Sequence, residues 1–489
     1  MLACKCFTGK SVLAISLLTA GILASIASTA AKADDGDFYI KPYVQLGDHS
    51  KLGLSKEDEE LVWFTRKPNA EWKVEVKTED KDWDSSHTHM HKQEVFSAPV
   101  SPLYEYTFDL HQLPPGKLFD YRVIEDGSTV FSAWSTARKA VDQSYSFAVF
   151  GDTGAGSVGQ KGIALHAYNE KPDFIVVPGD ITYDGGLFHE YMSRFFPVFN
   201  NDSVDERKGV PLLRSILTVA LLGNHDIALG GGYPTNFSRF PDALAYYIIW
   251  QNPLNGPVKT IGAPGAPICG GETAASKPFL KSVGAQYPRM NMFSFDYGNS
   301  HWLVLDGNLY MNWTDDKLRK WVEDDLTSSN ATWKFVTFHE PGFSEDAEHS
   351  REQRMRLLSD IFQKTGVDVV FAGHAHNYQR SYPLLFQPVL KHDKPSINED
   401  GTVPGEITLD KEFDGIKDTV PKGVLYIVTG AGGAHLYPII APKDGKELLY
   451  KSSSDIHSFT RCKINGGTLS FDQISENGQP VDHFSITKK

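Results

Sequence analysis

The stretch YSFAVFGDTG (residues 145–154) joins a run of mostly apolar residues to a Gly-Asp turn. A short apolar run rich in aromatic and β-branched side chains and closed by glycine is typical of a buried β-strand. The carboxylate of Asp152 therefore follows directly on the end of a predicted strand. This arrangement decides the fold because it is repeated along the chain.

Four further apolar runs end in the same way, each followed by polar residues of a restricted set. They are residues 174–177 before Gly179-Asp180-Ile181-Thr182-Tyr183, 217–222 before Gly223-Asn224-His225-Asp226, 336–338 before His339-Glu340-Pro341, and 367–372 before Gly373-His374-Ala375-His376. Helix-like segments at 187–199 and 314–326 alternate with the runs, and we expect Thr314 to cap the second. Strands that alternate with helices indicate an α/β layered domain, in which ligands bind at the carboxyl ends of the strands.

The polar side chains delivered to this edge are Asp, Asn and Tyr oxygens together with imidazoles. Taken singly, a Gly-Asp turn is ordinary turn chemistry and a buried histidine is ordinary core packing. Five such clusters at one edge predict a metal centre. Oxygen and imidazole donors suit iron, zinc or manganese, and the absence of cysteine from these motifs argues against an Fe–S site.

The motifs resemble those of the calcineurin-like metallophosphoesterases, and specifically of the purple acid phosphatases. That family is marked by Asp-x-Gly, Gly-Asp-x-x-Tyr, Gly-Asn-His-Asp/Glu, Val-x-x-His and Gly-His-x-His, and all five blocks are intact here, the fourth as Val336-Thr337-Phe338-His339. Tyr183 is the discriminating residue, because most other metallophosphoesterases lack it. The resemblance runs from about residue 38 to the end of the chain.

The resemblance implies a dinuclear centre. One ion, Fe(III) in the family, is expected on Asp152, Tyr183 and His376; the second, divalent Fe, Zn or Mn, is expected on Asn224, His339 and His374. Asp180 is expected to bridge them. Two cations held by a shared carboxylate bind a phosphoryl oxygen and activate a bridging hydroxide for in-line attack. The implied activity is hydrolysis of phosphate monoesters by a secreted acid phosphatase.

Two histidines are candidates for the catalytic groups that serve the leaving alcohol. His225 is adjacent to the expected ligand Asn224, and His349 lies ten residues beyond His339, where plant members of the family carry a histidine that faces the substrate. The alternative for His349 is an exposed residue at the start of a helix. Glu340 and Asp226 are expected to orient imidazoles from outside the ligand set.

Ahead of the predicted catalytic domain (145–489), residues 38–138 form several short runs with apolar alternation separated by Pro, Gly and Asp turns. This pattern predicts a small β-sandwich. Leu113-Pro114-Pro115-Gly116, followed by Phe119 and Tyr121, resembles the late strands of a fibronectin type III domain. The expected fold is thus an all-β sandwich followed by a four-layer α/β domain.

Residues 1–33 are predicted to be a cleaved signal peptide, with Lys5 and Lys10 before an apolar run and Ala31-Lys32-Ala33 as the cleavage site. A membrane anchor is the alternative. A secreted or periplasmic protein with no membrane span after cleavage follows from the first interpretation. Cleavage leaves Cys269 and Cys462, which either pair or stay as two buried thiols.

The composition excludes several classes. Of the 489 residues, 41% are hydrophobic and 22% charged, as in soluble globular proteins, and the net charge of -13 gives no support to nucleic-acid binding. Two alternatives to a monoesterase remain: the same metal core acting on diesters such as phospholipids or nucleotides, and a non-catalytic surface protein. The His87-Thr88-His89-Met90-His91 segment of the sandwich could chelate a metal, although solvent-facing polar alternation is the default.

Overall fold

The computed structural model describes residues 36–53, 55–85, 88–95, 102–227, 235–257, 273–440 and 447–488. Residues Asp37–Lys489 form one compact unit. The predicted signal peptide and Cys269 lie outside the described residues. Cys462 carries a free thiol and is buried. Among the described helices, none has the length and apolar character needed to cross a membrane.

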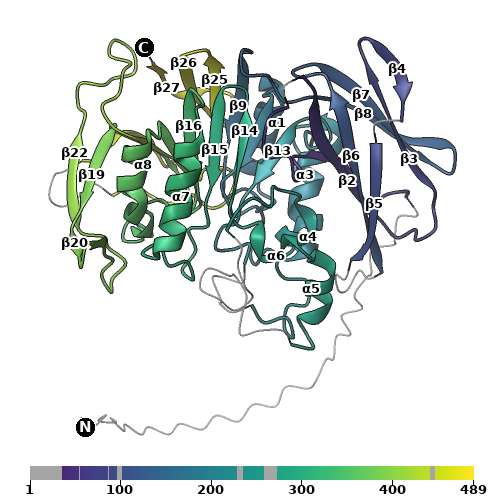
Figure 1. Cartoon of the computed structure of the whole chain (residues 1–489), viewed down its shortest axis with the longest axis horizontal. Helices are drawn as coiled ribbons and strands as arrows, with labels where there is room; N and C mark the ends of the chain where they lie inside the picture. The colour runs from purple at the N-terminus through teal and green to yellow at the C-terminus, as the bar shows by residue number, and fades with distance from the viewer. Residues whose placement is uncertain are drawn as a thin grey trace, which may run out of the picture. The chain divides into compact units, whose positions relative to one another are not determined.

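The N-terminal part is a sandwich of two four-stranded antiparallel sheets, as predicted (Figure 1). One sheet has the order β1 (Ile40–Gln45), β2 (Glu57–Thr65), β6 (Leu103–Leu113), β5 (Thr88–Val95), and the other β4 (Lys81–Asp84), β3 (Trp72–Thr78), β7 (Leu118–Glu125), β8 (Ser128–Thr136). Trp63 fills the space between them, stacked on Phe108 with ring centroids 4.8 Å apart. Such aromatic pairs stabilise a core beyond the area that they bury.

The C-terminal part contains two larger sheets. The first has the order β13 (Leu217–Ala220), β10 (Phe174–Val177), β9 (Tyr145–Val149), β25 (Ser458–Asn465), β26 (Thr468–Ser475), β27 (Pro480–Thr487). The second has the order β14 (Phe293–Tyr297), β15 (Ser300–Val304), β16 (Trp333–Thr337), β17 (Val369–Ala372), β23 (Leu425–Thr429), β18 (Tyr378–Ser381), β24 (Leu449–Ser453). The strands that precede the five motifs, β9, β10, β13, β16 and β17, are all paired in parallel within their sheets.

The two sheets face each other across an aromatic core. Phe147 of β9 meets Trp302 of β15 edge to face at 5.1 Å, and Phe174 of β10 stacks on Tyr297 of β14 at 4.2 Å. Cys462 belongs to this core. The inner face of each sheet is buried against the other sheet, and helices cover much of the outer face. Strands buried on both faces are near-continuous apolar runs, as β9, β10, β13, β16 and β17 are.

Helices cover the outer faces and complete the four predicted layers. Helix α1 (Val158–Glu170) packs Ile163, Ala164 and Ala167 against β9 and β10, and α7 (Asp316–Ser328) packs Leu318, Val322 and Leu326 against the second sheet beside α8 (Ser359–Thr365). The predicted cap of α7 was wrong by one residue. Asp315, not Thr314, accepts the backbone N–H groups of Lys317 and Leu318, and its carboxylate also complements the positive end of the helix.

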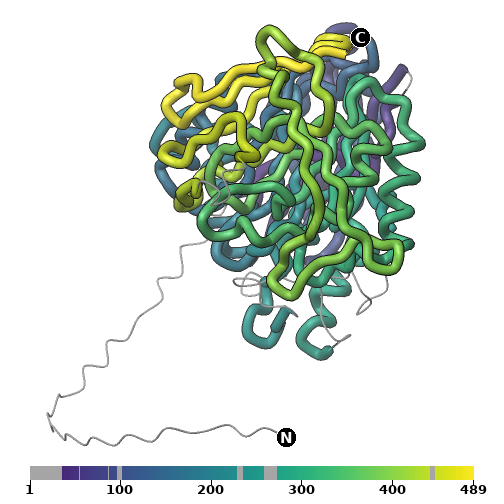
Figure 2. The backbone as a smooth tube through the Cα atoms, turned by 90° about the vertical axis from the view of Figure 1, so that its left-hand side faces the viewer, coloured from purple at the N-terminus to yellow at the C-terminus, as the bar shows by residue number. Residues whose placement is uncertain are grey.

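The connections carry shorter elements. They are α2 (Phe188–Glu190), a π-helix (Tyr191–Phe195), α3 (Phe196–Phe199), β11 (Asn200–Asp205), β12 (Gly209–Pro211), α4 (Tyr246–Ile249), α5 (Lys277–Val283), α6 (Gln286–Arg289), a 3-10 helix (Arg354–Leu358), β19 (Leu384–Pro388), β20 (Leu390–Lys391), β21 (Lys394–Pro395) and β22 (Gly405–Leu409). Figure 2 shows the hairpin of β19 and β22 in light green, nearest the viewer. The helix predicted at 187–199 is thus three short helical pieces.

The sandwich is bound to the α/β part by buried polar contacts. Tyr43 Oη and Gln45 Nε2 both donate to the carbonyl oxygen of Ile249, at 2.6 and 2.8 Å. Near the segment that joins the two parts, Arg138 forms a buried ion pair with Glu57 at 2.7 Å. A buried pair of this kind is costly to break from one side, because it leaves the other charge without a partner.

Candidate metal centre

The five motifs meet at the carboxyl ends of their strands, as the sequence predicts. Asp152 follows β9, Asp180 and Tyr183 follow β10, Asn224 and His225 follow β13, His339 follows β16, and His374 and His376 follow β17. An isolated bridge between Gly154 and Thr182 joins the first two loops. All seven expected ligands contact at least one other member of the set.

The backbone at this edge is held in unusual conformations. Asp152, Asp180 and His374 have φ of 58°, 47° and 67°, a left-handed region that non-glycine residues seldom adopt. Glycine is needed where the loops touch: a Cβ on Gly223 would lie 2.2 Å from Asp180 Oδ1, and one on Gly179 would lie 2.5 Å from His339 Nδ1. Strained ligand residues and close glycines are typical of functional sites.

Three of the expected ligands form one donor group. Tyr183 Oη donates to Asp152 Oδ1 at 3.1 Å and lies 3.0 Å from His376 Nε2, and His376 Nε2 lies 3.3 Å from Asp152 Oδ1. All three side chains are buried. Burial, together with the charges of Asp152 and Asp180, raises the pKa of Tyr183 well above 10. Only a strongly charged cation could hold this phenol as a phenolate.

A second donor group lies beside the first. His339 Nε2 is 3.1 Å from Asn224 Oδ1 and 3.2 Å from His374 Nδ1. His339 and His374 are buried, and Asn224 is partly exposed. Two imidazoles and an amide oxygen match the donor set that borderline divalent ions prefer.

Asp180 lies between the two groups. Its Oδ1 is 3.3 Å from His339 Nε2 and accepts the backbone N–H of His225 at 2.9 Å. Its Oδ2 is buried and has no hydrogen-bond partner among the described residues. Burial raises the pKa of Asp180, but the neighbouring imidazoles, that of His339 above all, outweigh this effect and leave the pKa well below its ordinary value. An ionised carboxylate with an unsatisfied buried oxygen is suited to receive a cation.

Each histidine that is expected to be a ligand has a hydrogen-bond partner on its other ring nitrogen. His339 Nδ1 donates to the Pro178 carbonyl at 2.8 Å and His376 Nδ1 donates to the His435 carbonyl at 2.6 Å. His374 Nε2 lies 3.1 Å from Glu352 Oε2. These bonds leave Nε2 of His339 and His376, and Nδ1 of His374, to face the donor groups, which is the arrangement of metal-binding imidazoles.

Each of the two candidate catalytic histidines lies beside a different donor group. His225 Nδ1 donates to the Asp184 carbonyl at 2.8 Å, and its ring lies 4.6 Å from that of Tyr183. The His349 ring lies 3.9 Å from that of His374, and its Nδ1 is 2.9 Å from Glu352 Oε1. Burial lowers the pKa of His349, but the contact with Glu352 outweighs it, and the pKa ends above 6.5.

Sequence reasoning missed two residues of this site. Glu352 contacts both His349 and His374, and Tyr437 stacks on His376 with ring centroids 4.1 Å apart and planes 10° from parallel. The spacing of three residues from His349 to Glu352 is a signal that could have found the glutamate. Tyr437 lies 61 residues beyond His376 in a loop, and no local pattern indicates it.

Asp226 and Glu340 were expected to orient imidazoles, but neither carboxylate forms a hydrogen bond to a histidine among the described residues. Asp226 is fully buried and accepts the backbone N–H groups of Gly223, at 2.9 Å, and Ile181, at 3.2 Å. It therefore ties the loops after β10 and β13 together. Burial raises the pKa of Glu340 to about 7, and its carboxylate packs against Gly307.

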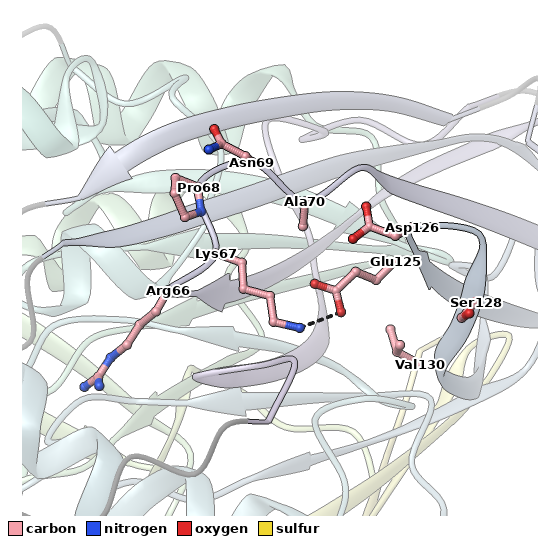
Figure 3. A pocket seen from close by; sticks show the side chains of 9 residues that line it. All are labelled: Arg66, Lys67, Pro68, Asn69, Ala70, Glu125, Asp126, Ser128 and Val130. Carbon is pink, nitrogen blue, oxygen red and sulfur yellow. Dashed lines mark hydrogen bonds and ion pairs between the residues drawn. The ribbon is translucent and has the colours of Figure 1, made fainter.

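A pocket of about 660 Å³ on the sandwich is unrelated to this centre. It is lined by Arg66, Lys67, Pro68, Asn69, Ala70, Glu125, Asp126, Ser128 and Val130 (Figure 3). A Lys67–Glu125 ion pair of 2.7 Å crosses it. None of the predicted site residues contributes to its lining.

Comparison with known proteins shows which families the chain is similar to. The sequence profile of the calcineurin-like phosphoesterases matches residues 145–378, which contain all five motifs. Among curated proteins, the chain is 24% identical over 260 residues to acid phosphatase type 7 of Mus musculus, covering 44% of this chain and 54% of that protein. It is 25% identical over 219 residues to a nucleotide pyrophosphatase/phosphodiesterase of Hordeum vulgare, covering 41% and 52%. The chain thus spans about half the length of these relatives.

Among solved structures, a purple acid phosphatase isolated from yellow lupin (Lupinus luteus) seeds shares the fold. Its TM-score is 0.64 at 16% sequence identity, and the match covers 91% of this chain and 74% of that one. At this identity the likeness concerns the fold alone. It spans both the sandwich and the α/β part, as the sequence resemblance implied.

Proposed function

We propose that this chain, whose residues 145–378 match the sequence profile of the calcineurin-like phosphoesterases, hydrolyses phosphate monoesters at a dinuclear metal centre. The observation that carries the proposal is the position of Asp180. Its carboxylate lies between two groups of metal-binding side chains and keeps one buried oxygen without a hydrogen-bond partner among the described residues. A shared carboxylate is the feature that a two-metal phosphoesterase needs.

In this proposal the oxygen-rich group, Asp152 and Tyr183 with His376, holds Fe(III). The imidazole-rich group, Asn224, His339 and His374, holds a divalent Fe, Zn or Mn ion. Asp180 is shared. When bound, such a pair of ions clamps the phosphoryl group and supplies a nucleophile from water. The buried phenol of Tyr183, next to two carboxylates, favours the higher charge at the first position.

The chain's own residues would then manage the substrate and the proton. His225, with Nδ1 committed to the Asp184 carbonyl, presents Nε2 toward the centre and is placed to protonate the leaving alkoxide. His349, paired with Glu352, is positioned as a cationic donor to the phosphate oxygens, because its pKa lies above 6.5. Both roles require protonated imidazoles, so an acidic pH optimum is expected.

A second activity, the hydrolysis of phosphodiesters, is favoured by one observation. The matched region is as similar to the barley nucleotide pyrophosphatase/phosphodiesterase as it is to the mouse acid phosphatase, at 25% and 24% identity. The metal core is common to both reactions, so the bound leaving group decides between them. We rank monoesters first because His225 and His349 can both serve a dianionic phosphate.

The test is a substrate panel run with metal analysis. Purified protein is assayed at pH 5 and pH 8.5 with p-nitrophenyl phosphate, bis-p-nitrophenyl phosphate and a nucleoside triphosphate, and its metals are counted. Two metals per chain, one of them iron, with a monoester kcat/KM above that for the diester, are expected. A diester preference would replace the monoesterase assignment with the second activity, and one metal or none in active protein would contradict the dinuclear centre.

We further propose that residues 1–33 direct export and are removed, so that the enzyme acts outside the cytoplasm as two parts, a 38–138 sandwich and a 145–489 catalytic domain. The supporting pattern is Ala31-Lys32-Ala33 after the apolar run. N-terminal sequencing of protein from the extracytoplasmic fraction should begin near Asp34. An intact Met1 in that fraction would contradict cleavage.

A further inference from the structure

The outer face of one sandwich sheet carries four histidines around one aspartate. His89 and His91 lie on β5, Asp109 and His111 on β6, and His49 in the segment after β1. We call these five residues the sandwich histidine cluster. None of them belongs to the candidate metal centre, and the proposed function leaves them unused.

Strand register brings the cluster together. In the β5–β6 pair, His89 is opposite Asp109 and His91 is opposite Thr107. Residues directly opposite share a face of the sheet, and residues two apart on a strand share it too. His89, His91, Asp109 and His111 therefore all project from one face, while Phe108 and Leu110 project into the sandwich core.

Three imidazoles converge on the Asp109 carboxylate. His91 Nε2 lies 3.6 Å and His111 Nε2 lies 3.9 Å from Asp109 Oδ2, and His49 Nε2 lies 3.8 Å from Oδ1. The His89 ring is 5.0 Å from that of His111. These nitrogen–oxygen distances are too long for hydrogen bonds. Among the described residues, the nitrogens of His91 and His111 that face Asp109 lie more than 4.8 Å from each other, so an ion held by both requires their side chains to rotate inward, which the exposed His91 is free to do.

The polar groups here are not satisfied by one another. His49 Nε2 is buried and has no hydrogen-bond partner in the part of the chain that the structure describes. Glu60 of β2, opposite Asp109 in register, is buried beside three other acids. Burial and the charges of Asp109, Glu105 and Asp48 raise the pKa of Glu60 well above its ordinary value. A cation at Asp109 would relieve this repulsion and give His49 Nε2 a partner.

We propose that the sandwich histidine cluster binds one divalent transition-metal ion of the zinc class, separate from the dinuclear centre, through Asp109 and the imidazoles of His49, His91 and His111, with His89 available as a further ligand. Imidazole with a carboxylate is a donor set for Zn²⁺, Cu²⁺ and Ni²⁺, and not for Mg²⁺ or Ca²⁺. The site does not depend on the proposed phosphatase function.

The position of the cluster suggests what the ion does. Strand β5 is at the edge of its sheet, next to β6 only. An ion held by His91 of β5, by Asp109 and His111 of β6 and by His49 would join the edge strand to its neighbour and to the segment after β1. Edge strands have one row of unpaired backbone groups, and a metal bridge would restrain this one.

The test uses the full-length protein with its catalytic metals loaded. Zn²⁺ is titrated by calorimetry, and bound metal is counted after desalting. The wild type is expected to bind one more zinc than a His91→Ala/His111→Ala variant, with equal phosphatase activity in both. Removing a residue that supports a metal ligand typically weakens metal binding about 10- to 100-fold, and removing a ligand itself should cost at least as much. His91→Ala and His111→Ala, made singly, should therefore each weaken zinc affinity at this site at least about tenfold.

The matched control is His483→Ala. His483 is another exposed histidine on a strand, with Nδ1 2.7 Å from Asp472. It should leave the additional zinc in place. Hydrogen exchange of residues 88–95 gives a second readout, since zinc should slow it in the wild type and not in the double variant. Equal zinc counts in wild type and double variant, or an equal loss in the control, would overturn the proposal.

Discussion

Glu352 Oε2 lies 3.1 Å from Nε2 of His374, so that the glutamate holds the ring whose other nitrogen faces the candidate metal centre. The same carboxylate contacts His349 through Oε1, at 2.9 Å. The two imidazoles lower the pKa of Glu352 against the effect of burial, which keeps the carboxylate charged. Glu352 thus connects an expected metal ligand with an expected substrate-facing residue.

The first prediction concerns this link. Glu352→Ala should lower metal retention and kcat about 10- to 100-fold, because His374 loses the partner that fixes its orientation and basicity. Glu352→Gln keeps a hydrogen-bond acceptor but loses the charge, and should fall between the alanine variant and the wild type. Metal content and monoester hydrolysis measure both. The neighbouring Glu348, whose side chain is exposed, gives the control Glu348→Ala. Unchanged metal content in Glu352→Ala would contradict the role.

The second prediction concerns the shared carboxylate. Asp180→Asn keeps the shape and the oxygen that accepts the His225 N–H, but removes the charge from the unsatisfied buried side. Both metals should be lost, and activity should fall by more than the roughly hundredfold effect of an outer partner. Asp226→Asn is the comparison, because Asp226 is also buried but bonds only backbone N–H groups in the interactions described above. If Asp180→Asn retained two metals, the bridge would be wrong.

The sequence predicted that the polar motifs gather at one place because each follows the carboxyl end of a parallel strand, whereas the assignment of individual residues as ligands rests on the resemblance to the purple acid phosphatases. Asp152, Asp180 and His339 are far apart in the chain, yet each position follows from a local pattern of apolar run and polar motif. Strand order brings Asp152 and Asp180 together, because β9 and β10 are neighbours in one sheet, whereas His339 follows β16 of the other sheet and reaches them through the face-to-face packing of the two sheets. The four layers follow from the same alternation.

What the sequence did not predict depends on contacts between distant segments. Tyr437 reaches His376 from a loop after β23, and its position follows from the packing of that loop. Helix α1 was missed because only Ile163 on its buried side is a large apolar residue; the others, Gly159, Gln160, Ala164 and Ala167, are small or polar and give little periodic contrast. Before α7, Asp315 and Thr314 are adjacent cap candidates, and only the backbone geometry distinguishes them.

A third prediction concerns stability and pH. His301 is buried between two acids, with Nδ1 2.7 Å from Asp296 and Nε2 2.8 Å from Asp325. Burial lowers the pKa of His301, but the two carboxylates outweigh it and raise the pKa above 6.5. A raised folded-state pKa gives stability that is complete below the unfolded pKa of about 6.5 and is lost as the pH rises through the folded value.

His301→Gln should therefore lower the melting temperature most near pH 6, and the gap from the wild type should narrow by pH 9. Thermal unfolding of both proteins across this range measures the gap. His392→Gln is the control, since His392 is exposed in a loop and its substitution should give a small difference at every pH. A gap between wild type and His301→Gln that stays constant from pH 6 to pH 9 would show that His301 is not charged in the fold.

The last prediction concerns Tyr183. Its phenol lies 3.1 Å from Asp152 and 3.0 Å from His376, and burial with two nearby carboxylates holds its pKa well above 10. Only a strongly charged ion such as Fe(III) would displace the phenolic proton, and phenolate bound to Fe(III) should give the oxidised protein a visible charge-transfer band. Tyr183→Phe removes the oxygen and keeps the ring, so the variant should fold and lose the band. The control is Tyr437→Phe. It keeps the ring that stacks on His376 and should keep the band. If iron-loaded wild type and Tyr183→Phe have the same visible spectrum, the phenol is a wall of the site and not a ligand.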